Sequence, residues 1–170
     1  LREIDAVRAT RDFDETGSLN PHIRAAIAFN TDSKVAKTVR SNGVLITQAT
    51  PRGGRISGQS AVMRLNGWNW EDAAISMSDG IHLNWPSSYK YKWNGNGIDL
   101  VKNENNTKEI AELKQLFVNA KSYRLKHHDN DMRLEAMQSL LKGVSNLYIH
   151  VNTAKGIISS VNFAKANGVK

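Results

Sequence analysis

The chain has 170 residues, 40% of them hydrophobic, which is typical of one folded domain. It carries 23 Lys and Arg residues against 16 Asp and Glu, giving a net charge of +7, and it contains no cysteine. This composition excludes disulfides, thiolate metal sites and a cysteine nucleophile. No run approaches the ~18 apolar residues of a membrane-spanning helix, so we expect no membrane partner.

Basic residues are spread along the chain rather than gathered in one segment. The densest group, "KSYRLKHH" at 121–128, falls at the expected end of a helix, where the helix dipole favours cations. A nucleic-acid-binding domain usually concentrates its charge in a patch or stripe. We therefore expect a solvated basic surface and no nucleic acid partner. A small nucleic-acid-binding domain remains a competing hypothesis that rests on charge alone.

The first half of the chain alternates between helix and strand patterns. Turn-forming residues fill 14–21, and a short helix is expected to begin near Pro21. After it we expect a helix over 31–43, a strand over 44–50, a polar glycine-rich segment over 51–60, a strand over 61–65, a helix around 69–77 and a strand over 80–85.

The second half begins with residues 86–106, which are rich in Trp, Tyr, Asn and Gly without a clear period, and we interpret them as an excursion loop. Apolar residues at helical spacing then predict helices over 107–123 and 131–143. A strand over 146–152 follows, and a helix over 153–168 ends the pattern. Its cap is Thr153, its stop is Gly168, and its expected buried stripe is Ile157, Ile158, Val161 and Ala164.

This alternation predicts a mainly parallel α/β arrangement. Only about four strands are visible, too few for a complete eight-stranded barrel of ~250 residues. We therefore predict one α/β domain over 1–170, with the character of a partial (β/α) TIM-barrel-like unit.

The strand "NLYIHVN" separates two kinds of side chain, because alternate strand residues point to opposite faces. The odd-numbered residues from Leu147 to Val151 are apolar, and the even-numbered ones from Tyr148 to Asn152 are polar. Ligand sites lie at the carboxyl ends of parallel strands, close to the place of His150. A core histidine satisfied by the backbone is the competing interpretation. No HxH or HExxH pattern occurs and nothing in the sequence ties His82 to His150, so no metal site is complete.

The segment "TPRGGRISGQSAV" is a second candidate site. Glycines let the backbone approach a ligand closely, and Arg52 and Arg55 could receive an anion. The patterns of nucleotide-binding loops and of a serine nucleophile are absent. An ordinary flexible connection is the alternative. The four tryptophans, Trp68, Trp70, Trp85 and Trp93, favour core or loop packing over a carbohydrate platform.

Three segments together resemble proteins of the amidohydrolase superfamily, of the imidazolonepropionase-like type. They are "ATRDFDETGSLNPHIRAAIAFNTDS", "SNGVLITQATPRGGRISGQSAVMRLNGWNWEDAA" and "YIHVNTAKGIISSVNFAKANGV", in this order and at similar spacing. The resemblance spans nearly the whole chain and is weakest over 86–130. It implies a β/α barrel hydrolase whose divalent metal, most often zinc, activates water for attack on a C–N bond of an amide or cyclic amide.

The resemblance also implies roles for particular residues. His150 in "YIHVN" matches a middle-strand histidine that binds metal. The expected contacts to a small-molecule substrate are Arg52, Gly53, Gly54, Gln59 and Asn152. The sequence departs from the family pattern because it contains no HxH and because Lys155 and Gly156 stand where many relatives carry acidic residues.

The missing HxH leads us to interpret the chain as an internal piece of a longer hydrolase. The first barrel strand would precede Leu1 and the last strands would follow Lys170. We expect the piece alone to be inactive, and either to self-associate through exposed strand edges or to close up in a rearranged small α/β fold. A non-catalytic relative that keeps the scaffold and binds a ligand or partner is the alternative. The compartment stays open.

Overall fold

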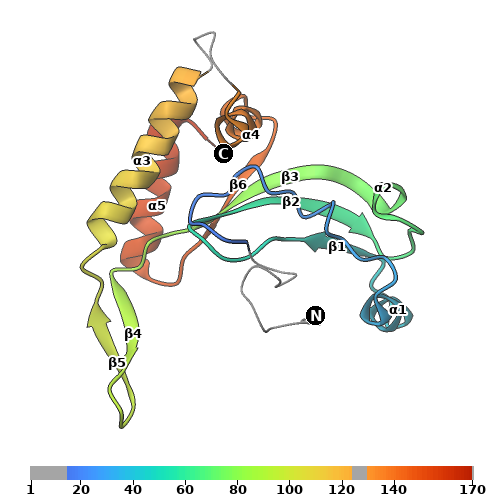
Figure 1. The fold of residues 1–170 in the computed structure, drawn as a ribbon, viewed down its shortest axis with the longest axis horizontal. Coiled ribbons are helices and arrows are strands. Elements are labelled where there is room, and N and C mark those ends of the chain that lie inside the picture. Colours follow the sequence, from blue (N-terminus) through green and yellow to red (C-terminus); the bar gives the residue numbers. More distant parts are fainter. Residues whose placement is uncertain (1–14, 124–129, 170) are drawn as a thin grey trace.

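A computed structural model describes residues 15–123 and 130–169 as a four-stranded sheet with helices packed at one end (Figure 1). His127, His128 and most of the basic cluster lie outside the described residues. The strand order is β1 (Ile46–Ala49), β2 (Ile56–Arg64), β3 (Ala74–Asn84) and β6 (Asn146–His150).

The expectation of a mainly parallel sheet is wrong. β1 pairs with β2 and β2 with β3 in antiparallel fashion, and only β3 and β6 run parallel. The reason is connection length: 50–55 joins β1 to β2, and 65–73 joins β2 to β3. A parallel crossover needs a dozen or more residues, which only the long connection to β6 provides.

The sheet is curled into a half-barrel because the β2–β3 ladder is irregular. Its register shifts between Ile56 and Gly58 and twice more between Ser60 and Met63. Such bulges bend a strand and increase its twist. At Gly58, φ is +137° and an added Cβ would stand 2.6 Å from the carbonyl oxygen of Ile23, so only glycine lets the 21–25 segment lie this close.

The main core lies between the sheet and three helices. These are α3 (Asn106–Tyr123), α4 (Met132–Leu141) and α5 (Ala154–Asn167), and their expected positions are confirmed within a few residues. Figure 1 shows α3 and α5 side by side across the end of the sheet. The rings of Phe117 and Phe163 meet edge to face, with centroids 4.9 Å apart. The sheet contributes Ile56, Ile81, Leu83 and Trp85 to this core.

The predicted buried stripe of α5 is wrong. Ile157, Ile158 and Val161 are exposed, and the buried residues are Ser160 and Phe163. Thr153 and Gly168 do cap the helix as expected: the Thr153 hydroxyl accepts from the Gly156 amide, and Gly168 is left-handed. The helix is apolar on two sides, so its sequence alone did not specify which side meets the sheet.

The other end of the sheet has a smaller core of Ala26, Ala61, Met63 and Ala73. The expected helix near Pro21 is absent, since turns and isolated bridges to β2 occupy 19–28. Helix α1 (Lys34–Ser41) is present, but the expected helix at 69–77 shrinks to α2 (Trp70–Ala73), because β3 begins at Ala74. Pairing with β2 overrides local helix propensity there.

Residues 86–106 form a hairpin rather than an irregular loop. β4 (Tyr89–Trp93) and β5 (Ile98–Lys102) pair in register around an Asn-Gly-rich turn. The hairpin extends away from the sheet and helices (Figure 1). Among the tryptophans, Trp85 is buried in the main core, as core packing predicts, whereas Trp68 and Trp93 are largely exposed.

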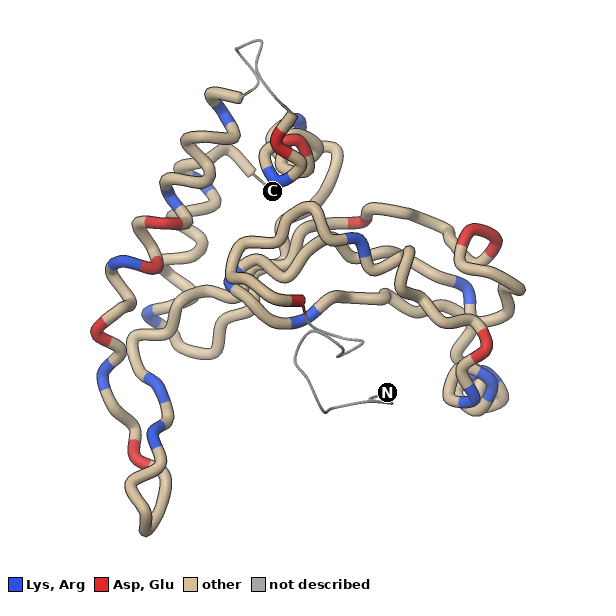
Figure 2. Tube along the Cα trace, viewed as in Figure 1, with Lys and Arg blue, Asp and Glu red and all other residues tan. Residues whose placement is uncertain are grey.

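Lys and Arg are distributed over α1, the sheet, the hairpin and α3, with Asp and Glu among them (Figure 2). None of the helices in the described ranges has the length and apolar content needed to cross a bilayer.

Candidate functional site

One face of the β3–β6 pair is polar, as strand alternation predicts. Ile81, Leu83 and the odd-numbered residues of β6 pack into the helix-side core. The intervening residues His82, Tyr148 and His150 point to the opposite face. We call the set Gln48, Ser60, Asp79, His82, Tyr148 and His150 the polar sheet face.

Two histidines from distant parts of the chain meet on this face. His82 Nδ1 lies 2.8 Å from His150 Nε2, a hydrogen bond between imidazoles. The His82 ring also stacks against Tyr148 and His150, with centroids 4.8 Å and 5.1 Å away. His82 is buried and His150 is exposed. His82 therefore sits beneath the surface and orients the more accessible His150.

A carboxylate anchors the other end of the polar sheet face. Asp79 Oδ2 accepts a hydrogen bond of 2.8 Å from the Tyr148 hydroxyl and one of 2.5 Å from Gln48 Nε2. Gln48 Nε2 also lies 3.4 Å from the Ser60 hydroxyl. The Tyr148 ring crosses over Gly80, where an added Cβ would be 2.5 Å from the ring. The glycine thus makes room for the tyrosine that connects Asp79 to the histidines.

Burial and charge set the protonation of His82. Burial and then the neighbouring His150 lower the pKa of His82 to about 4, against an opposing effect of Asp79. His82 is therefore neutral near pH 7. Its Nε2 is buried without a hydrogen-bond partner in the structure. An unpartnered lone pair there costs less than an unpartnered N–H, so the favoured tautomer donates from His82 Nδ1 to His150 Nε2.

The Tyr148 hydroxyl stays protonated over a wider range than usual. Its hydrogen bond to Asp79, reinforced by burial and by the charge of that carboxylate, raises the pKa of Tyr148. A phenolate beside Asp79 would place two negative charges together. Tyr148 is consequently a hydrogen-bond donor that keeps Asp79 in place, rather than a base.

Only the first part of the predicted glycine-rich segment, 51–55, is a tight turn, because β2 begins at Ile56. The turn lies beside the same end of the sheet. Gly54 has φ +62°, and an added Cβ would be 3.0 Å from the carbonyl oxygen of Ser18. The Gly53 carbonyl accepts from the Ser57 hydroxyl, and the Gly54 carbonyl accepts from Asn84 Nδ2. Asn84 is the register partner of His150. The turn therefore reaches the histidines through one residue of β3.

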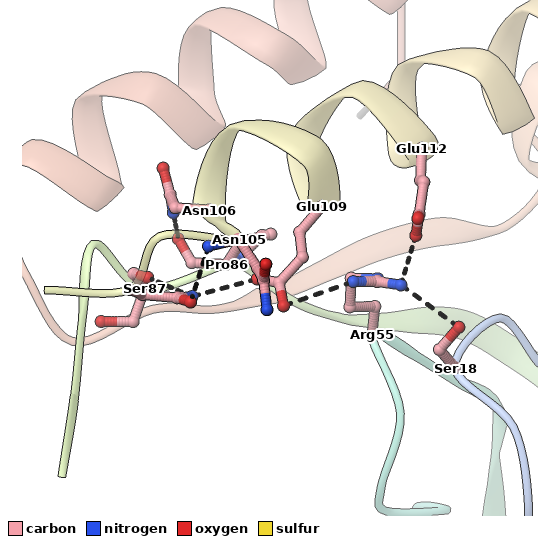
Figure 3. Close-up of polar contacts among 9 residues, drawn as sticks. Ser18, Arg55, Pro86, Ser87, Asn105, Asn106, Glu109 and Glu112 are labelled. Atoms are coloured by element: carbon pink, nitrogen blue, oxygen red, sulfur yellow. Dashed lines mark hydrogen bonds and ion pairs between the residues drawn. The ribbon is translucent and has the colours of Figure 1, made fainter. Parts of the chain in front are cut away.

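The two arginines of this turn differ in their surroundings. Arg52 is exposed. Arg55 forms an ion pair of 3.5 Å with Glu109, contacts Glu112 through Nη2 and reaches the Ser18 hydroxyl (Figure 3). Its charge is thus matched by two carboxylates of α3, and it holds the helix against the turn. The idea that Arg55 receives an anionic ligand does not fit this arrangement.

The other two predicted substrate contacts lie in different environments. Gln59 is buried, donating to the Pro21 carbonyl and accepting from the Ser78 hydroxyl. Asn152 is exposed just after β6. Their contact with a substrate stays a prediction, as it does for Arg52, Gly53 and Gly54.

The donor atoms on the polar sheet face do not complete a metal centre. Within 15–123 and 130–169, no three His, Asp or Glu side chains gather closely enough to hold an ion. The two imidazoles that meet are hydrogen-bonded to each other through His150 Nε2, so only His150 Nδ1 faces away from this contact. A zinc ion usually has four ligands, and His150 can supply at most one of them. The polar sheet face by itself therefore does not form a zinc site.

Sequence reasoning singled out His150 as a candidate ligand but did not predict which side chains gather around it. His82 and Asp79 lie 68 and 71 residues before it, and the parallel pairing of β3 with β6 brings them together. The signal was present in "SDGIHLN", where polar residues alternate with Ile81 and Leu83. The contact itself can be predicted only when the register between β3 and β6 is known.

No protein-family model and no curated protein matches the chain. A solved structure does match: an amidohydrolase from Thermotoga maritima MSB8, with a TM-score of 0.74 and 16% sequence identity. The match covers 97% of this chain and 45% of that protein, so the chain spans less than half of it. The chain therefore has an amidohydrolase-like fold.

Proposed function

We propose that this chain is a scaffold segment of an amidohydrolase-like, metal-dependent hydrolase that cleaves a C–N bond in an amide or cyclic amide. The observation that supports the proposal is the position of His150. It lies exposed at the carboxyl end of β6, on the polar sheet face, where ligands of parallel strands are commonly bound. Fold similarity by itself assigns no activity, so the proposal depends on this face.

Within this function, His150 would bind a divalent cation through Nδ1, which requires its Nε2 to carry the proton and donate to His82 Nδ1, the reverse of the tautomer favoured without a metal. Zinc suits nitrogen ligands. The remaining ligands would come from outside the described residues, so we assign no reaction step to a metal. What the described residues contribute is positioning: His82 fixes the ring of His150, and Asp79 fixes Tyr148. A small-molecule substrate would approach beside the glycine-rich turn, with Arg52 and Asn152 as its exposed neighbours.

The test uses the complete polypeptide that carries this chain. Zinc-loaded protein is assayed with a panel of N-acyl amides, lactams and other cyclic amides, and the bound metal is measured by elemental analysis. We expect hydrolysis that a chelator abolishes and zinc restores. Losing a supporting partner of a metal ligand costs ~10–100-fold in affinity or activity, so His150→Gln is expected to cost at least that much.

The matched control is Lys92→Gln on the hairpin, which should leave metal content and hydrolysis unchanged. The 170-residue chain alone is expected to show no hydrolysis and no tight stoichiometric zinc binding by calorimetry. A complete polypeptide that retains no metal and cleaves nothing on the panel would contradict the proposal and favour a non-catalytic binding scaffold.

A further inference from the structure

The β4–β5 hairpin presents an apolar face that none of the described residues covers. Register pairs place Tyr89 beside Lys102, Tyr91 beside Leu100, and Trp93 beside Ile98, all on the same side of the ribbon. The five apolar members of this set are between 53% and 80% exposed. We call Tyr89, Tyr91, Trp93, Ile98 and Leu100 the hairpin face.

The opposite side of the same hairpin differs in chemistry. It carries Lys90 beside Val101 and Lys92 beside Asp99. A hairpin that only needed to be soluble would have no reason to gather its aromatic residues on one side. This asymmetry indicates that the aromatic side is covered in the functional protein and that the side with Lys90 and Lys92 faces water.

The hairpin is held in a fixed direction at its base. The Asn103 amide donates to the Ser88 carbonyl, and its side chain donates to the Ser87 carbonyl and to Glu109. Asn106, at the start of α3, donates to the Pro86 carbonyl, as Figure 3 shows. The arm is therefore anchored to α3, which limits the entropy lost when its face is covered.

We infer that the hairpin face is the contact surface of a homodimer, in which it packs against the same face of a second copy of this chain. The size of the face supports this occupant. Aromatic side chains bury ~150–250 Å² each, so the five exposed residues offer on the order of 600 Å² per copy. Two copies would bury on the order of 1,200 Å², which is the lower end of specific interfaces.

The arrangement is self-complementary, as a twofold interface requires. Consider a twofold axis that lies in the interface, perpendicular to the strands, and passes over the Tyr91–Leu100 pair. It places Tyr89 of one copy over Trp93 of the other, and Lys102 of one copy over Ile98 of the other. No like charges then face each other. Pairing through the hairpin edges is less favourable, because Lys90, Lys92 and Lys102 lie along the two strands and lysines oppose strand addition. The two faces are thus better suited to contact than the edges.

The first test is sedimentation velocity with light scattering over a concentration series from about 1 to about 100 μM. We expect a monomer–dimer equilibrium within this range. Tyr91→Ser with Trp93→Ser should weaken the dimer at least 10-fold. Lys90→Ser with Lys92→Ser, on the other side of the same strand, is the matched control and should leave it unchanged. Ile158→Lys on α5 should also have no effect.

A second test does not depend on those variants folding. The chain has no cysteine, so single cysteines can be placed freely. Leu100→Cys lies at the proposed axis and should be cross-linked efficiently by a short bis-maleimide, whereas Val101→Cys on the opposite side should not. Equal cross-linking of the two, or a strict monomer throughout the concentration series, would overturn the proposal. A dimer sensitive only to Ile158→Lys, or a monomer that binds anionic vesicles or oligonucleotides through the hairpin, would also overturn it.

Discussion

The two faces of the β3–β6 pair differ in the side chains that they carry. On the helix side, Ile81 and Leu83 join the rings of Phe117 and Phe163 in a closed apolar core. On the other side, His82, Tyr148 and Asp79 form hydrogen bonds and leave His150 exposed. The first face buries apolar side chains, which stabilises the fold, and the second leaves an imidazole exposed. Strand alternation alone can therefore place a buried apolar face and a polar face on the same two strands.

The largest expected effect comes from breaking the helix side. Phe117→Ala removes a fully buried ring and leaves a cavity beside Phe163, which should lower the free energy of unfolding by ~3–5 kcal/mol. Urea unfolding followed by circular dichroism measures it. The neighbouring Val118 is exposed, so Val118→Ala should change stability by less than ~0.5 kcal/mol. Similar losses at both positions would show that the helix-side core is not closed as described.

A smaller effect is expected where the polar face depends on the backbone beneath it. In Gly80→Ala the new Cβ would stand 2.5 Å from the Tyr148 ring and 2.7 Å from the Asn146 carbonyl oxygen. The ring and the parallel pairing must shift, at a cost of ~1–3 kcal/mol. Gly97→Ala in the hairpin turn is the control, because an added Cβ there meets nothing within 4 Å. Thermal unfolding of both variants separates the two cases, and equal midpoints would contradict the close packing of Tyr148 on Gly80.

Over a single pH unit, the smallest expected effect is the pH dependence of the metal-free chain. The pKa of His82 is about 4 in the folded state, against 6.5 for an unperturbed histidine, since burial and His150 disfavour its charged form while Asp79 opposes them. Between these values the unfolded chain binds more protons, so the free energy of unfolding falls as pH drops from 6.5 toward 4. One proton gives a slope of at most ~1.4 kcal/mol per pH unit.

His82→Gln isolates this contribution, because its stability curve should be flatter than the wild-type curve over the same window. Urea unfolding at several pH values provides the measurement. Parallel curves for the two proteins would mean that His82 titrates normally in the folded state.

Local patterns predicted the local structure well. Helical spacing identified α3 and α4, and strand parity assigned Leu147 and Ile149 to the core and Tyr148 and His150 to the other face. The cap at Thr153 and the end at Gly168 also follow from nearby residues. These features depend on contacts within a few positions, which a sequence displays directly.

The features that the sequence did not predict depend on distant contacts. The antiparallel pairing of β1 to β3 and the short α2 result from pairing that overrides local preference. The side on which α5 packs depends on which of its two apolar faces meets the sheet. The His82–His150 contact joins residues 68 positions apart and requires the register of two strands connected by a long crossover. The hairpin had local signals in its Asn-Gly turn and in the alternation of aromatic residues and lysines over 89–93, which the prediction of an irregular loop overlooked.

Arg55 connects parts of the molecule that are far apart in the chain. It contacts Ser18 before the sheet and both Glu109 and Glu112 on α3, whose first turn anchors the hairpin. When one of these segments opens, the others lose a shared charge partner. Local opening of the N-terminal segment, the start of α3 and the hairpin base is therefore coupled, and their backbone amides would exchange with solvent as one cooperative unit.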